Sequence, residues 1–325
     1  MNRMNYPLLF EPQLKERIWG GNKLKEILHK QAEEENLGES WEISNVSGSS
    51  SVVRNGGLKG WTLERLLQEE GEQLLGKRLK QQFGTEFPLL IKYIDARTAL
   101  SVQLHPGDQL AQKRHNSFGK TEMWYIMQAE EGAVINVGFK NTTSKEEYLD
   151  FLEKGKITEL LNFEQVREGD AVFINTGKVH AIGAGVLLAE IQQTSDITYR
   201  IYDWDRTDAN GIARELHTDL ALEAIDFEKK EDYICSFQKE INSSVNIARC
   251  PYFTTNILVV EGELEKDYSV MDSFIIYMCV KGSGSIEVDG QVENIELGQT
   301  VLIPAVNKLV RISAEHAELL EVYID

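Results

Sequence analysis

The chain carries one strand-and-corner pattern twice, as GDAVFINTGKVH at residues 169–180 and as GQTVLIPAVNKL at residues 298–309. The two segments align without gaps. Each begins at a Gly turn, continues through an apolar strand and ends in a corner that contains Asn or Pro. An internal repeat of this kind indicates two copies of one structural unit. The copies differ at their last residue, which is His180 in the first and Leu309 in the second.

Other strand-like runs extend outward from this repeat, separated by Gly- and Asp-containing turns at regular spacing, a pattern typical of a sandwich or barrel. The expected strands are 87–95, 100–105, 122–128, 133–139, 170–175 and 187–192, then 256–261, 274–281, 284–288 and 300–303. We therefore expect two related β-barrels. The charged stretch at 226–232 is the expected boundary, which gives domains 1–232 and 233–325.

Helices are fewer, and we expect them at 62–83, 143–161 and 218–225. The first opens with Thr62 as a plausible N-cap, and Gly71 and Gly76 are expected to break it. Gly155 is expected to split the second. The fold class is therefore mainly β with some helices (α+β), and the helical additions belong to the first barrel.

Composition excludes several classes of protein. Among 325 residues, 42% are hydrophobic and the formal net charge is −18, which argues against a nucleic-acid or anionic-membrane surface. No run reaches the length of a membrane helix and the first ten residues do not resemble a signal peptide, so we expect a cytoplasmic protein. Three widely spaced cysteines fit neither a disulfide framework nor a Cys-x-x-Cys zinc site. No nucleotide-binding or nucleophile-elbow motif is evident.

The segment SVQLHPGD at residues 101–108 carries the chemistry. Its alternation puts Gln103 and His105 on one face of a strand, close enough to converge on one ion. Glu122 opens another apolar strand, where an inward carboxylate needs a partner, and His180 follows a Gly turn. Together these four residues form a metal-site hypothesis. Two imidazoles, a carboxylate and an amide suit a borderline ion such as zinc, with iron and manganese as alternatives.

These residues resemble the two motifs of the cupin superfamily. The second motif is matched by Gly169, Asn175, Gly177 and His180, with Asn in place of Pro. The first motif has two histidines and a Glu, and it is matched by Gln103, His105 and Glu122. The resemblance implies two cupin-type jelly-roll barrels, the second without metal.

The Gln in the first motif is similar to that of the type I mannose-6-phosphate isomerases (phosphomannose isomerases), whose zinc is held by Gln, His, Glu and His. Further matches to their short bacterial form are RIWGG at 17–21, GESWEIS at 38–44, KTE at 120–122 and DITYR at 196–200. The resemblance covers nearly the whole chain, but the long helical domain of larger members is absent.

The resemblance implies a zinc-dependent aldose-ketose isomerase that interconverts mannose 6-phosphate and fructose 6-phosphate through an enediolate. One zinc ion per chain would be held by Gln103, His105, Glu122 and His180. The catalytic residues would be Arg200, Asp196 and Lys120, with Asp196 as the chosen base and Glu190 and Lys120 as competitors. Substrate would also be bound by Ser101, Lys92 and Glu190.

Structural interpretations remain open beside these roles. Arg200 could form a surface ion pair with a nearby Asp, and Lys92 could be a structural ion pair within its apolar strand. Trp19, Trp41 and Trp124 could frame a sugar pocket or simply fill the core. The remaining histidines are expected not to bind metal: His29, His115, His217 and His316.

Two other functions are compatible with the same motifs: a metal-dependent sugar sensor without turnover, and an iron-dependent cupin oxygenase. A sensor needs no Lys120, Asp196 and Arg200 around its metal, and oxygenases favour histidine-rich sites. The isomerase is therefore the favoured function. We expect a small phosphorylated sugar as substrate, no nucleic-acid or membrane partner, and a monomer or homodimer.

Overall fold

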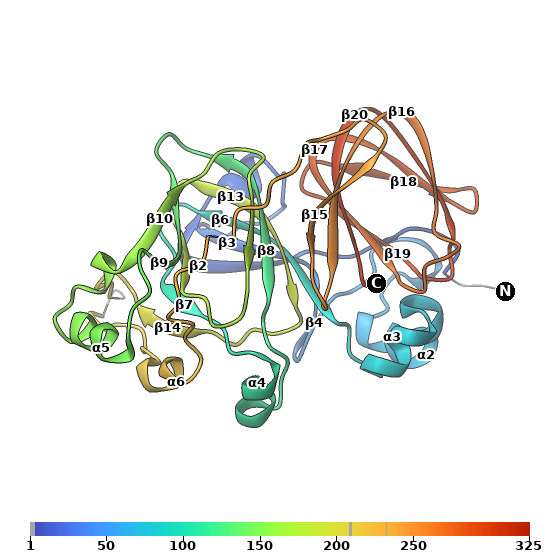
Figure 1. Cartoon of the computed structure of the whole chain (residues 1–325). Coiled ribbons are helices and arrows are strands. Elements are labelled where there is room, and N and C mark those ends of the chain that lie inside the picture. The colour runs from blue at the N-terminus through green and yellow to red at the C-terminus, as the bar shows by residue number, and fades with distance from the viewer. Residues whose placement is uncertain (1–3, 208–209, 232) are drawn as a thin grey trace.

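The computed structural model describes residues 4–207, 210–231 and 233–325. Two β-barrels lie side by side, with the C-terminus beside the second barrel (Figure 1). This arrangement confirms the expected β-rich α+β fold. The boundary expected between residues 232 and 233 stays a prediction, and residue 232 lies outside the described residues.

The first barrel is built from two antiparallel sheets. The larger one contains, in spatial order, β11 (Ala171–Ile174), β8 (Glu122–Ala129), β13 (Val186–Gln193), β6 (Leu89–Ala96), β3 (Leu37–Ile43) and β2 (Gln13–Gly21). The smaller one contains β10 (Leu161–Gln165), β9 (Val134–Phe139), β12 (His180–Ile182), β7 (Val102–Leu104) and β14 (Tyr199–Tyr202). A short hairpin, β4 (Asn45–Val46) and β5 (Ser49–Ser50), follows β3.

The second barrel is one continuous sheet because its long strands bend from one side of the barrel to the other. Its order is β1 (Leu8–Leu9), β19 (Thr300–Ile303), β17 (Ile275–Val288), β20 (Leu309–Tyr323), β16 (Thr254–Asp267) and β15 (Ser244–Arg249), with β18 (Gln291–Glu296) paired to β17. The expectation of separate strands at 274–281 and 284–288 is wrong. Gly282 lies within β17 beside a bulge, where the strand bends without ending.

The helices lie at the ends and sides of the barrels (Figure 1). They are α1 (Lys23–Glu26), α2 (Leu63–Leu75), α3 (Lys77–Phe83), α4 (Asp108–His115), α5 (Lys145–Glu153) and α6 (Thr218–Leu222), with 3-10 turns at Gly56–Leu58 and Ile157–Glu159. α5 and α6 pack on the outer face of the smaller sheet through Tyr148 and Ala221. In the part of the chain that the structure describes, no helix is long and apolar enough to cross a membrane.

α2 and α3 contact the second barrel, although their sequence precedes the first barrel's β6. The Asp272 carboxylate accepts hydrogen bonds of 3.0 and 2.8 Å from the backbone N–H groups of Lys77 and Arg78, at the start of α3. The backbone N–H of Ala305 donates to the carbonyl of Leu74 at 2.9 Å. The N-terminal third of the chain therefore supports both barrels.

The expected helix signals are confirmed, one of them displaced by one residue. The Thr62 side chain caps α2 by accepting from the backbone N–H of Arg65, and Gly76, at φ +90°, separates α2 from α3. Gly155, at φ +67°, follows α5 and precedes the next 3-10 turn. The helical backbone is also interrupted beside Gly71: Glu70, at φ −132° and ψ 22°, is not helical, so α2 is kinked one residue before the expected position.

The repeated strands put the two barrels in a common register. β11 and β19 are the equivalent strands, and in β11 Ile174 pairs with Glu122 of β8. In β19, Ile303 pairs with Ile275 of β17. Ile174 and Ile303 are each the sixth residue of their copy of the repeat. The residues that pair with them are therefore equivalent, so Ile275 in the second barrel takes the place of Glu122.

The same register makes two glutamates equivalent. Trp124, two residues after Glu122, pairs with Glu190 on β13. Tyr277, two residues after Ile275, pairs with Glu321 on β20. Glu321 therefore takes the place of Glu190, and both side chains face the inside of their own barrel.

The ungapped alignment of His180 with Leu309 is wrong by one residue. Leu309 is 54% exposed, whereas Val310 is fully buried inside the second barrel. His180 pairs with Gln103, and Val310 pairs with Lys266. The corner before β20 is one residue longer than the corner before β12, and a one-residue slip turns every following side chain to the other face. Val310 and Lys266 thus occupy the places of His180 and Gln103.

Candidate metal centre and cleft

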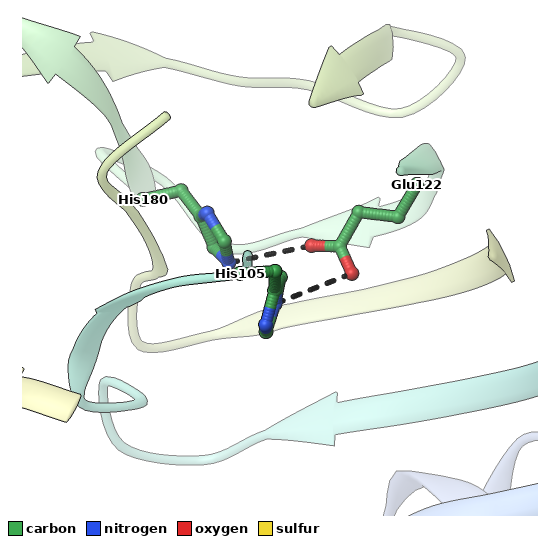
Figure 2. Close-up of side chains that lie close together, drawn as sticks. All are labelled: His105, Glu122 and His180. Atoms are coloured by element: carbon green, nitrogen blue, oxygen red, sulfur yellow. Dashed lines mark ion pairs between the residues drawn. The ribbon is translucent and has the colours of Figure 1, made fainter. Parts of the chain in front are cut away.

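Three side chains from three separate places in the first barrel converge on one point (Figure 2). His105 Nε2 lies 3.6 Å from one carboxylate oxygen of Glu122, and His180 Nε2 lies 3.3 Å from the other. All three residues are about 1% exposed. Both contacts are longer than normal hydrogen bonds, and the three ligand-type atoms lie within 4.8 Å of one another.

The far nitrogens of both imidazoles fix which nitrogen carries the proton. His105 Nδ1 lies 2.8 Å from the carbonyl of Ile197, and His180 Nδ1 lies 2.9 Å from the carbonyl of Lys178. A carbonyl only accepts, so each Nδ1 donates and each Nε2 presents a lone pair to the shared point. This is the second contact that metal-binding histidines normally make.

Burial keeps these imidazoles neutral. It lowers the pKa of His180 to about 4 and the pKa of His105 well below its ordinary value. Burial also raises the pKa of the Glu122 carboxyl, and the ammonium group of Lys120, 3.6 Å away, offsets only part of that rise. Neutral imidazoles beside a carboxylate form a donor set for a divalent cation rather than a pair of salt bridges.

The unsatisfied atoms support the same conclusion. His105 Nε2, His180 Nε2 and Glu122 Oε2 are buried and have no hydrogen-bond partner among the described residues. Buried polar atoms without partners are rare because they lose water and gain nothing in return. A divalent ion at the shared point would satisfy all three, so the residues present fit a metal.

Local sequence explains how the ligands reach this point. Val102 and Leu104 are fully buried against the helices outside β7, which turns Gln103 inward as the alternation predicted. His180 begins β12 just after Gly177, which has φ +79°. A Cβ at Gly177 would lie 2.5 Å from the carbonyl of Ala224, so only Gly fits this turn.

The metal centre lies beside a cleft with a volume of about 390 Å³. Nine of the ten predicted site residues line this cleft: Lys92, Ser101, Gln103, Lys120, Glu122, His180, Glu190, Asp196 and Arg200. The tenth, His105, lies behind it within the buried cluster. The structure therefore brings all the sequence-predicted residues together, although their roles stay predictions.

Arg200 is held by polar contacts inside the barrel mouth. Its Nε donates to Ser101 Oγ at 3.3 Å, and Ser101 Oγ donates in turn to Gln103 Oε1 at 3.3 Å. The carboxylate that could have paired with Arg200, that of Asp203, accepts from Arg206 and Arg214 instead. The arrangement leaves the Arg200 guanidinium facing the cleft.

A row of alternating charges crosses the opposite wall. Arg17 lies 2.6 Å from Glu39, and Lys92 lies 3.9 Å from Glu39 and 3.6 Å from Glu190. Burial lowers the pKa of Lys92, but the carboxylates of Glu190 and Glu39 outweigh this and the net pKa is raised. Burial raises the pKa of Glu190, and Lys92 only partly opposes it. Lys92 is therefore both a structural ion pair and a cleft residue.

The remaining predicted residues differ in their surroundings. Asp196 is exposed at the edge of the cleft, between β13 and β14. Trp19, Trp41 and Trp124 line the cleft and are also at least 93% buried, so they satisfy both of their interpretations. Among the other histidines, His217 Nδ1 accepts from the backbone N–H of Arg200 at 3.1 Å, and His316 contacts Glu261 on the surface of the second barrel.

Sequence reasoning missed three charged residues of the cleft: Arg17, Glu39 and Arg214. Arg17 and Glu39 belong to the segments RIWGG and GESWEIS, which were recognised without a role for these side chains. Pairing of β2 with β3 and of β3 with β6 brings them to the barrel mouth. Arg214 lies in a segment without a motif, so no signal in the sequence pointed to it.

Comparison with known proteins gives one family. The model of the phosphomannose isomerase type I catalytic domain matches residues 8–148, and that of the mannose-6-phosphate isomerase cupin domain matches residues 244–324. The mannose-6-phosphate isomerase ManA of Bacillus subtilis is 36% identical over 92% of this chain and 93% of its own length. A mannose-6-phosphate isomerase of Streptococcus mutans is 33% identical over 93% of each chain.

Solved structures agree with these relatives. The crystal structure of the mannose 6-phosphate isomerase from Bacillus subtilis superposes with a TM-score of 0.88 at 32% identity, covering 98% of this chain and 100% of the other. Phosphomannose isomerase from Salmonella typhimurium shares the fold, with a TM-score of 0.79 at 17% identity and 98% and 99% coverage. The resemblance carried by the motifs is confirmed: the chain belongs to the type I phosphomannose isomerase family and is an isomerase of that family.

Proposed function

We propose that this protein interconverts mannose 6-phosphate and fructose 6-phosphate, with one zinc ion held by Gln103, His105, Glu122 and His180. The observation that carries the proposal is the convergence of three buried, unpartnered ligand atoms beside a cleft lined by cationic side chains. Two imidazoles and a carboxylate are typical zinc ligands, and the Gln103 carbonyl completes the set. When bound, zinc would supply a Lewis acid that polarises sugar oxygens.

The chain's own cations would stabilise the negative charge that develops on the sugar during proton transfer between C1 and C2. Arg200 is held by Ser101 and by the carbonyl of Glu215, at 3.3 and 2.8 Å, so its guanidinium is oriented before substrate arrives. Lys120 lies beside Glu122 at the metal end of the cleft. Fixed charges of this kind act without reorganisation at the moment of reaction.

The substrate phosphate needs cations that are not fully neutralised by carboxylates. Arg17, Arg200 and Arg214 all line the cleft and are partly exposed. Arg17 shares the Glu39 carboxylate with Lys92. Arg214 shares the Asp203 carboxylate with Arg206, so neither arginine is fully neutralised. We propose that phosphate binds toward these arginines, because guanidinium groups bind phosphate oxygens in pairs. Ser101, Lys92 and Glu190 would contact sugar hydroxyls along the same cleft.

Proton transfer requires a carboxylate whose pKa approaches neutrality. Asp196, the choice made from the sequence, lines the cleft but is exposed. Glu190 is buried, its pKa is raised by burial, and its Oε1 has no hydrogen-bond partner among the described residues. Burial and the raised pKa therefore favour Glu190 over Asp196 as the base.

Isomerisation of mannose 6-phosphate tests the proposal directly. The full chain is stripped of metal, assayed, reloaded with one equivalent of zinc and assayed again, with metal content measured at each step. We expect turnover to disappear on stripping and return with zinc. Full turnover in the stripped protein would refute the metal role. Binding of the sugar phosphate without turnover in either state would favour a sensor.

Exchange of the substrate C2 proton with solvent separates the two candidate bases. Asp196→Asn and Glu190→Gln are nearly isosteric, so each removes a proton acceptor with little change in shape. We expect the base variant to lose both turnover and exchange by at least about 100-fold. The other variant should keep the wild-type ratio of C2-proton exchange to turnover. Normal proton exchange in Asp196→Asn would exclude Asp196 as the base.

A further inference from the structure

The second barrel has a cleft of its own, with a volume of about 530 Å³. We call it the second-barrel cleft, and its floor is formed by Asn256, Lys266, Tyr268 and Glu321. Tyr268, Asn256 and Glu321 are 4%, 6% and 1% exposed. It lies on the other barrel from the metal centre and shares no lining residue with the first cleft.

Strand register puts this cleft in the place that the metal-bearing cleft has in the first barrel. Glu321 corresponds to Glu190, and the residues that pair with them across the sheet are Asn256 and Lys92. Lys266 corresponds to Gln103 by its pairing with Val310. The second barrel therefore keeps an open, polar mouth where the first barrel has its functional site.

The polar groups on this floor are joined in one network. Glu321 lies 3.1 Å from Lys266 Nζ and accepts from Asn256 Nδ2 at 2.8 Å and from the Tyr268 hydroxyl. Lys266 also donates to Ser244 Oγ at 2.6 Å. Replacing a buried ion pair of this kind by apolar residues is often neutral or stabilising. Stability alone thus gives no reason to keep it.

The deeper half of the same barrel is apolar. Leu258, Cys279 and Leu319 are fully buried there. Each lies on the same strand as one residue near the mouth, two positions away from it: Asn256, Tyr277 and Glu321, respectively. The barrel could therefore be closed by apolar side chains in the same way at its mouth. The polar groups are confined to the end that opens to solvent, which is where a ligand would enter.

The charges of the second-barrel cleft indicate the class of ligand. Lys266 is paired with Glu321, and Arg249 lies 2.9 Å from Asp325. No cation is left in excess to bind a phosphate, unlike the first cleft with its arginines. Besides Met271 and the exposed carboxylate of Asp267, which adds negative charge, the rest of the wall offers hydroxyl and amide groups: Ser244, Asn246, Thr254 and Tyr323. Such groups both donate and accept, as a polyhydroxy compound requires.

We propose that the second-barrel cleft binds an uncharged polyhydroxy compound of hexose size, separately from the metal-bearing cleft. The volume of about 530 Å³ lies in the usual range for small-molecule sites. The partly exposed Tyr323 side chain would offer apolar surface for the C–H face of a sugar or hexitol, and the amides and hydroxyls would meet its oxygens. The proposal stands on the second barrel alone and does not depend on the proposed isomerisation.

The test uses the zinc-loaded full chain and two hexitols, D-mannitol and D-sorbitol, which have no charge and no carbonyl group. Binding is measured by ligand-observed NMR titration, with the equilibrium mixture of mannose 6-phosphate and fructose 6-phosphate present to saturate the first cleft. We expect saturable binding of at least one hexitol with a Kd on the order of 1 mM. Absence of saturable binding for both hexitols overturns the proposal.

Two variants locate the binding. Ser244→Phe, on the edge strand β15, fills the second-barrel cleft and should weaken hexitol binding at least 10-fold while isomerisation is retained. Tyr323→Phe removes only the hydroxyl that accepts from Asn256 at 3.3 Å and should weaken binding about 3-fold to 10-fold. The second variant keeps the test valid if the first does not fold.

A first-cleft variant is the matched control. Arg200→Ala should leave hexitol binding unchanged. If hexitol binding is lost in Arg200→Ala but kept in both second-barrel variants, the site is the first cleft and the proposal is wrong. The proposal is also wrong if inorganic phosphate displaces the hexitol at equal concentration, because the second-barrel cleft has no cation in excess.

Discussion

Glu190 and Glu321 occupy equivalent positions in the two barrels, yet their environments shift the pKa of the carboxyl group in opposite directions. Burial raises the pKa of Glu190, and its partner Lys92, 3.6 Å away, does not reverse the effect. Burial also opposes the charged form of Glu321, but Lys266, Tyr268 and Asn256 outweigh it and lower its pKa. One carboxylate is left under-satisfied and the other is fully bonded.

The apolar halves of the barrels differ much less. Equivalent positions hold side chains of similar character: Ile94 and Leu258, Ile126 and Cys279, Val172 and Val301, Leu188 and Leu319. The proposed metal ligands, in contrast, have no counterparts with metal-binding side chains. The positions of Gln103, Glu122 and His180 hold Lys266, Ile275 and Val310. The shared frame therefore specifies the barrel, and a few mouth residues specify the chemistry.

Exchanging one residue between the barrels should have the largest effect. His180→Val gives the first barrel the residue of the second, removes one of the ligands and should reduce turnover on the order of 1000-fold, with loss of bound zinc. Turnover and metal content per chain measure this. A variant that keeps one equivalent of zinc and normal turnover would exclude His180 as a ligand.

The reverse exchange is the control. Val310→His puts an imidazole into the second barrel, where Ile275 and Lys266 supply no further ligand. We expect no additional zinc, full isomerase turnover and a loss of about 2 kcal/mol in the free energy of unfolding, because a polar ring is buried without a partner. A second equivalent of bound zinc would contradict the assigned equivalence.

Removing the charge from each glutamate should give opposite results. Glu321→Gln leaves Lys266 without its buried carboxylate and should cost about 3 kcal/mol of unfolding free energy, with turnover unchanged. Glu190→Gln leaves Lys92 with Glu39 at 3.9 Å and should change the unfolding free energy by less than about 1 kcal/mol, with turnover reduced. Denaturant unfolding and isomerase assays of both variants measure the contrast.

Lowering the pH should reduce the difference in unfolding free energy between the Glu321→Gln and Glu190→Gln variants. The pKa of Glu321 is lowered from 4.5, so its contribution to stability is present above pH 4.5 and is lost as the pH falls through the folded-state pKa. The stability gap between the wild type and Glu321→Gln should therefore shrink below pH 4.5. The pKa of Glu190 is raised, so in metal-free protein its contribution is present at low pH and lost as the pH rises. Parallel profiles for the two variants would refute the opposite shifts.

The positions of the residues in the candidate metal centre could be predicted because each lies on a local pattern. The alternation around Gln103 and the Gly turn before His180 each determine, within a few residues of sequence, which way the side chain points. Arg17 and Arg214 could not, because they reach the cleft through strands and a connecting segment that only tertiary pairing brings together. Chemistry carried by local pattern is readable from the sequence, whereas chemistry assembled from distant segments is not.

The long strands of the second barrel were underestimated for a related reason. Gly262 and Gly282, at φ +76° and +72°, have the backbone of turn residues, but each lies at a bulge inside a continuous strand. A glycine in the sequence indicates that the backbone changes direction there, but it does not show whether the β-strand pairing ends at that residue. The one-residue error in aligning His180 has the same origin, since corner length is not fixed by the apolar strand that precedes it.

The smallest expected effect concerns the helices that join the barrels. Asp272 of the second barrel accepts from the backbone N–H groups of Lys77 and Arg78 and so caps α3 from a distant part of the chain. Asp272→Ala should cost about 1 kcal/mol of unfolding free energy, a typical value for a lost helix cap. Turnover should be unchanged because α3 lies away from the metal-bearing cleft.

Asp267→Ala is the matched control, because Asp267 is an exposed carboxylate of the same barrel that bonds only to the nearby Ser269 in the part of the chain described. It should change the unfolding free energy by less than about 0.5 kcal/mol. Equal effects of the two variants would show that α3 gains nothing from its cap in the second barrel. A larger effect of Asp272→Ala would mean that the contact between α3, which precedes β6, and the second barrel stabilises the folded chain.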